Sequence, residues 1–198
     1  MRYIITESQY NILLEYTNVK NIKDINWYGL KDKGRAEFRD QFFNLNDKLR
    51  IPENFIPLVS QLMISFGNIR NEVESDVLKG SLSQSTVNKF IQNVSSAVST
   101  ITKDQKVSNL MKSIPSSQRM IAKSPIGKNL IKSKINDSVS LLGKSYFIDG
   151  MVGALKKYYD GNSPIVKKYI NVLTQMGNVI SNSESLKNNI QNSVFNIL

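Results

Sequence analysis

Cysteine and histidine are both absent from this sequence of 198 residues. Without cysteine the chain has no disulfide framework, no thiol nucleophile and no thiolate ligand for a metal ion. Without histidine it lacks the side chain that serves most often as a general base and as a metal ligand. Chemistry carried by carboxylates alone stays open. We predict a protein that is not an enzyme, with no catalytic residue, no cofactor and no metal site.

Long apolar runs are also missing. No segment reaches the roughly 18 to 20 unbroken apolar residues that a bilayer-spanning helix needs, so we expect no transmembrane span. The first residues carry Glu7 and lack a small-residue cleavage site, so they do not look like a signal peptide. We therefore expect the chain to act where it is synthesised, or in an assembly built there.

Positive charge is concentrated in the second half of the chain. Hydrophobic residues make up 40% and charged residues 21%, which is typical of a folded domain. The formal net charge is +10, yet residues 1–100 hold nearly balanced charges. Within residues 103–134 a single acid, Asp104, accompanies eight basic residues. These are Lys103, Lys106, Lys112, Arg119, Lys123, Lys128, Lys132 and Lys134.

This basic stretch is the candidate anion-binding or nucleic-acid-binding site. Charge of that density attracts polyanions, and the attraction weakens steeply with salt. A nucleic-acid backbone, an anionic membrane and an acidic protein surface all fit, and a purely solvated surface stays open. No base-reading motif accompanies the lysines, so contact with DNA or RNA would go to phosphates and be independent of sequence.

The hydrophobic pattern predicts a mainly α multi-helix bundle with a short N-terminal β-strand. Apolar residues recur at spacings of three and four through most of the chain. Helices are expected over 35–49, from Pro57, and over 69–79, 87–101, 126–142, 145–159, 164–181 and 184 to the end. Pro115 and Pro125 break the basic stretch, which suggests two regions, 1–114 and 115–198, that could also share one core.

Local signals set several expected boundaries. The polar passage from Asn18 to Lys33 is predicted to be turn-rich. Ser83 or Ser85 is expected to cap the helix over 87–101. Gly143-Lys144-Ser145 lacks the earlier glycine and the strand of a phosphate loop, so Gly143 is expected to end one helix and Ser145 to cap the next. The segment from Ser181 to Glu184 is predicted to form a capping box.

Three acids, Glu72, Glu74 and Asp76, stand two residues apart. On a helix this spacing spreads side chains over different faces. We therefore expect a solvated acidic surface here and not a metal site.

The N-terminal residues form a compact unit. Thr6 and Gln9 fit a capping box, and Ile5 and Tyr10 stand at the hydrophobic-staple positions around it. The apolar strand before the cap is too short to be stable unless it pairs with another sheet edge. That edge lies either in this chain or in a neighbouring subunit. The predicted partner-docking residues are Ile4, Ile5, Tyr10, Leu13 and Leu14.

The segment IITESQYNILLE, within residues 3–15, resembles the opening of small uncharacterised proteins of tailed phages. The resemblance implies a phage structural or packaged accessory protein, located in the virion or the host cytoplasm, that docks on other virion subunits. Its basic half would then face nucleic acid or an acidic protein surface. The alternatives are a soluble, sequence-nonspecific DNA- or RNA-binding accessory protein, and a membrane-active protein using amphipathic helices around 126–159.

Overall fold

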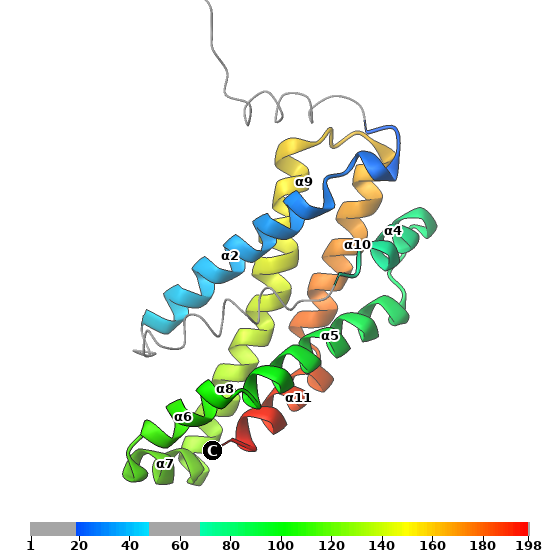
Figure 1. Ribbon diagram of the computed structural model, residues 1–198. Helices are drawn as coiled ribbons and strands as arrows, with labels where there is room; N and C mark the ends of the chain where they lie inside the picture. Colours follow the sequence, from blue (N-terminus) through cyan, green and yellow to red (C-terminus); the bar gives the residue numbers. More distant parts are fainter. Residues whose placement is uncertain (1–18, 48–67, 198) are drawn as a thin grey trace, which may run out of the picture.

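The described part of the computed structural model, residues 19–47 and 68–197, is mainly helical and contains no strand. This confirms the mainly α class, whereas the expected N-terminal strand and the helix from Pro57 lie outside the described residues. Figure 1 shows the helices arranged as an elongated bundle. In chain order they are η1 (Ile22–Asp24), α2 (Trp27–Asp47), α4 (Arg70–Lys79), α5 (Gln84–Thr102), α6 (Gln105–Ser113), α7 (Ser116–Lys123), α8 (Pro125–Leu141), η3 (Leu142–Val152), α9 (Gly153–Tyr158), α10 (Pro164–Ser181) and α11 (Glu184–Phe195).

The centre of the bundle is one long helical run. It begins in α8, continues through η3, which is a π-helix, and ends in α9. Helices α2 and α10 pack against η3. Phe147, Met151, Leu155 and Leu173 are completely buried between these elements. A π-helical stretch of this length is unusual, because such turns mostly occur singly within α-helices.

Two glycine contacts fix the position of this central run. The Cα of Gly34 in α2 lies so close to Gly150 in η3 that a Cβ atom on Gly150 would overlap it. On the other side of η3, a Cβ atom on Gly177 of α10 would lie 2.7 Å from the carbonyl oxygen of Gly143. Glycine permits such close backbone approach because it has no side chain.

Gly143 therefore does not end a helix, and the prediction that Ser145 caps a new one is wrong. Ser145 is buried within η3. The structural reason is tertiary, because the missing side chain of Gly143 makes room for the backbone of Gly177. The residues next to Gly143 in the sequence give no sign of this contact, because Gly177 lies on another helix.

Helix α2 also begins earlier than expected, at Trp27, so the turn-rich interpretation of residues up to Lys33 is wrong beyond Asn26. The Asn26 side chain accepts a 2.9 Å hydrogen bond from the Gly29 amide and caps the first turn. The side chain of Trp27 is buried in the core. Burial of this helix face compensates for the two glycines in α2, which disfavour a helix on propensity alone.

Other boundaries agree with local signals. The Ser83 hydroxyl accepts from the Thr86 amide and caps α5, and Pro164 occupies the first turn of α10. The final cap differs from the prediction: Ser181 belongs to α10, and Ser183 caps α11 by accepting from the Leu186 amide.

Apolar side chains from both sides of Pro115 share one hydrophobic core. The cluster includes residues of α2, α4 and α5, which precede Pro115, and residues of α8, η3, α9, α10 and α11, which follow it. Helices α6 and α7 contribute little to it: of the described residues between Val98 and Ile135 only Ile131 packs against this core, and the buried Val107 of α6 lies apart from it. The basic stretch is thus carried by helices that project from the core.

Candidate functional site

The predicted basic residues lie together at one end of the molecule. We call residues 103–134 the basic tip; it comprises α6, α7 and the first half of α8. In Figure 1 α6 and α7 occupy the end of the bundle opposite α4 and α9. Although α5 and α8 belong to the core, the chain between them extends to this end of the bundle, so the helices that carry the cations lie together there.

A sharp turn joins α7 to α8 within the tip. The Ser124 side chain donates to the Ile121 carbonyl at 2.6 Å and accepts from the Gly127 amide at 3.1 Å. Pro125 occupies the first turn of α8, where its missing amide hydrogen costs nothing. Gly127 is buried against the α7 backbone, and a Cβ atom there would overlap the carbonyl group of Ile121. The two helices therefore meet backbone to backbone.

Most of the cations of the tip are exposed to solvent. Lys123, Lys128 and Lys132 are exposed, and none of them forms an ion pair within the described part of the chain. Lys134 is half-buried and lies 3.7 Å from Asp137. Lys103 and Lys112 are exposed as well, Arg119 is half-buried, and the Lys106 side chain lies outside what the structure describes. This surface combines high positive charge with little internal neutralisation.

Four large apolar side chains are exposed among these cations, which the sequence did not reveal. Met120 and Ile121 in α7 are 73% and 64% exposed, and Ile126 and Leu130 in α8 are 74% and 60% exposed. Ile126 and Leu130 share the helical spacing of the apolar residues expected over 126–142, but burial in the core begins only at Ile135. One signal was available: α7, confined between two prolines, is too short to bury an apolar face on its own.

The region around 126–159, proposed above as membrane-active, is mostly core. Most of its apolar residues from Ile135 onward, including Val139, Phe147 and Leu155, are buried against other helices. Those side chains are not available to a membrane in this fold. Within the described residues no helix is long and apolar enough to cross a bilayer.

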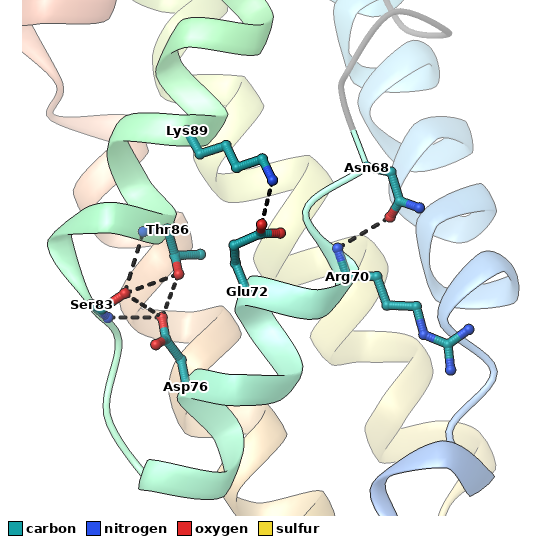
Figure 2. A network of polar contacts seen from close by, with 7 residues as sticks. All are labelled: Asn68, Arg70, Glu72, Asp76, Ser83, Thr86 and Lys89. Atoms are coloured by element: carbon teal, nitrogen blue, oxygen red, sulfur yellow. Dashed lines mark hydrogen bonds and ion pairs between the residues drawn. The ribbon is translucent and has the colours of Figure 1, made fainter.

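The three spaced acids lie in α4 and belong to structural contacts, of which Figure 2 shows those of Glu72 and Asp76. Glu72 pairs with Lys89, and Glu74 lies 2.6 Å from Arg70. Asp76 is 1% exposed, so the expectation of a solvated acid is wrong for this residue. Over the described ranges, no group of three acidic side chains could hold a metal ion.

Asp76 is buried because it ties α4 to the start of α5. Its carboxylate accepts hydrogen bonds from the Ser83 amide at 2.8 Å, the Ser83 hydroxyl at 3.0 Å and the Thr86 hydroxyl at 2.6 Å. Burial acts to raise the pKa of this carboxyl, but the hydrogen bonds from Thr86 and Ser83 outweigh it and hold the pKa below its ordinary value. This network serves the fold.

An open groove of about 880 Å³ runs between α5 and the end of α10 with the start of α11. Side-chain amides and hydroxyls line most of it, including those of Asn88, Gln92 and Asn182, together with the apolar Ile91. Among the described lining residues Glu184 is the one that carries a charge. Among the described lining residues there is no pair of a nucleophile and a base, and no cluster of charges. It provides no chemistry that competes with the basic tip as the candidate site.

Two further results bear on the site. The predicted docking residues Ile4, Ile5, Tyr10, Leu13 and Leu14 lie outside the described residues. No protein-family model matches the chain, and searches of curated proteins and of solved structures returned no significant match.

Proposed function

We propose that the protein is a non-enzymatic structural or accessory protein of a phage particle, and that its basic tip holds it against a surface of dense negative charge. The observation that carries the proposal is the projection of the tip from the core with Lys123, Lys128 and Lys132 exposed and forming no ion pair with any described residue. Charged side chains that do not stabilise the fold are free to bind a partner.

The phage assignment has a separate basis. It rests on the resemblance of residues 3–15 to tailed-phage proteins, and it places the chain in the virion or in the host cytoplasm. Docking on other virion subunits would use the N-terminal segment, while the tip would face packaged nucleic acid or an acidic surface. Mass spectrometry of purified particles tests this part: the chain should be present, and its absence would contradict a role in the virion.

A second candidate is a soluble accessory protein that binds DNA or RNA without sequence preference. The balance of eight basic residues against one acid over 103–134 favours it. Phosphate contacts supply affinity but no sequence information. This candidate shares the tip with the first and differs in location, so absence from particles combined with nucleic-acid binding would favour it.

A salt titration on unrelated DNA duplexes tests the tip in either case. The tip triple changes Lys123, Lys128 and Lys132 to glutamate. Each lost phosphate contact removes about 0.9 from the slope of log affinity against log salt concentration, so the slope should fall by roughly two to three. Equal slopes for the triple and the wild type would contradict the proposal.

The control is a second charge-reversal triple outside the tip. Lys144, Lys156 and Lys167 are also exposed and lie on η3, α9 and α10. Changing them to glutamate lowers the net charge by the same amount as the tip triple does. If total charge alone decides binding, both triples lose affinity equally; the proposal requires the control triple to lose much less.

A further inference from the structure

We propose that the basic tip binds the interface of an anionic phospholipid bilayer, with Met120, Ile121, Ile126 and Leu130 inserted among the lipids. This inference rests on the proposed function and names the charged surface. Its basis is the combination of an apolar cluster with exposed lysines at a projecting end of the molecule.

The apolar side chains are concentrated in the tip. Of the seven strongly exposed large apolar residues in the described part of the chain, four fall between residues 120 and 130. The other three, Tyr28, Leu78 and Val179, lie singly on α2, α4 and α10. Scattered apolar residues are normal on a protein surface, whereas a cluster marks an interaction site.

The turn between α7 and α8 sets the geometry of this cluster. Gly127 brings the two helix backbones into contact, and Ser124 holds the turn closed. Met120 and Ile121 therefore lie in the last turn of α7, and Ile126 lies in the first turn of α8. Leu130 follows Ile126 by four residues, so it lies one turn further along the same face of α8.

Cations occupy other faces of the helices that carry the apolar residues, because Lys128 and Lys132 stand two residues from Ile126 and Leu130 in α8. Arg119 and Lys123 lie on α7, and Lys128 and Lys132 lie on α8. Lysine side chains extend their charge toward phosphate groups while their methylene stems stay beside apolar surface. An apolar face combined with basic residues on the polar face is the composition by which surface helices attach to anionic membranes.

A lipid interface suits this surface better than nucleic acid does. A phosphate backbone would neutralise the lysines but leave Ile121, Ile126 and Leu130 in water. A bilayer interface offers anionic headgroups and an apolar layer at the depth of one side chain. The tip is also a projecting end of the bundle, which can enter a deformable interface without a matching cavity.

Attachment of this kind is peripheral and reversible. A few inserted side chains hold weakly on their own, so the charge and the apolar cluster are both required. The contributions of the charge and of the apolar cluster can be separated by mutation, because Ile126 and Leu130 can be changed without altering any lysine.

The full chain is tested by co-sedimentation with phosphatidylcholine vesicles, with and without phosphatidylserine. The wild type should bind only the vesicles that contain phosphatidylserine. The pair Ile126→Gln and Leu130→Gln should weaken that binding by about tenfold or more while DNA binding stays unchanged. Leu78→Gln, which changes a similarly exposed leucine on α4, should bind like the wild type.

A fluorescent probe reports insertion directly. Because the chain has no cysteine, Ile121→Cys and Leu78→Cys each provide a unique labelling site for an environment-sensitive dye. The dye at 121 should shift to the blue with phosphatidylserine vesicles, and the dye at 78 should not. A dye at 121 that is already shielded in the free protein would overturn the inference, because another part of the chain would then cover the tip.

The outcomes separate the inference from the proposed function. Salt-sensitive binding to DNA or to poly-glutamate without vesicle binding would overturn the lipid inference and leave the proposed function standing. A wild type that binds neither DNA, nor poly-glutamate, nor phosphatidylserine vesicles would overturn both the lipid inference and the proposed function. Vesicle binding that survives the Gln pair unchanged would show purely electrostatic attraction and would also overturn the insertion.

Discussion

The Thr86 hydroxyl donates a 2.6 Å hydrogen bond to the buried carboxylate of Asp76, ten residues earlier in the chain. Ser83 adds two further hydrogen bonds to the same carboxylate oxygen. The contact closes the connection between α4 and α5 and anchors the first turn of the helix that leads to the basic tip (Figure 2). It is the clearest buried polar network in the described residues.

Replacing Asp76 by asparagine should destabilise the protein by about 1 to 3 kcal/mol at neutral pH, because donors that faced a carboxylate lose their charged acceptor. The folded-state pKa of Asp76 lies below its ordinary value of 3.8. Its stabilisation is therefore present above that value and is lost as the pH falls through the lower, folded-state pKa. Urea unfolding of the wild type and of the variant measures this. The difference between their free energies of unfolding should be smaller near pH 3 than at pH 7. A difference independent of pH would contradict this account of the carboxylate.

The glycine contacts around η3 predict large effects from one methyl group. Gly34→Ala and Gly177→Ala should each lower the free energy of unfolding by about 1 to 3 kcal/mol or more, because the new Cβ overlaps backbone that cannot move freely. Gly161→Ala is the control, since no atom lies within 4 Å of its added Cβ. Thermal unfolding followed by circular dichroism compares the three. Equal melting temperatures for all would show that η3 does not pack as described.

The turn in the basic tip predicts a local effect that the core does not share. Gly127→Ala places a Cβ against the Ile121 carbonyl, so α7 must shift away from α8. The single tryptophan, Trp27, is buried in the core and reports global folding. The fluorescence of Trp27 should stay native. Binding to anionic vesicles should fall, because the apolar residues of α7 move away from those of α8. Full binding by this variant would contradict the geometry given for the turn.

Two buried tyrosines should respond differently to loss of the hydroxyl group. The Tyr169 hydroxyl lies near the Glu74 carboxylate but makes no hydrogen bond of good geometry in the described structure, whereas the Tyr159 hydroxyl accepts from the Asn26 amide at 2.9 Å. Tyr169→Phe should therefore be neutral or stabilising, and Tyr159→Phe should cost about 1 kcal/mol. Chemical denaturation measures both.

Ionisation of Tyr169 offers an independent check. Burial raises the pKa of this phenol, and the nearby Glu74 carboxylate adds to the effect. Spectrophotometric titration of the wild type and of Tyr169→Phe should show the same absorbance change through the ordinary tyrosine range. A smaller change in the variant within that range would mean that Tyr169 is accessible to solvent.

Local patterns in the sequence predicted the parts of the fold that local chemistry decides. The Ser83 cap, the breaks at Pro115 and Pro125 and the start of α10 at Pro164 depend on neighbouring residues only. The density of charge over 103–134 was visible for the same reason. These signals were sufficient to place most helices and the candidate site along the chain.

Features that depend on distant contacts could not be predicted in this way. The continuation of the helix through Gly143 requires Gly177, and the early start of α2 depends on burial of Trp27. Asp76 seemed a surface acid because its partners lie on the next helix. Ile126 and Leu130 have the same helical spacing as the buried Ile135. Only the packing of the helices shows that these two residues lie outside the core.

Lysine reactivity in the bound and free protein tests the central claim most directly. The full chain is acetylated briefly, alone and with phosphatidylserine vesicles or a DNA duplex, and each site is quantified by mass spectrometry. We predict that Lys123, Lys128 and Lys132 lose reactivity on binding, while Lys144 and Lys156 keep it. Protection of the last two lysines with none at the tip would contradict the account.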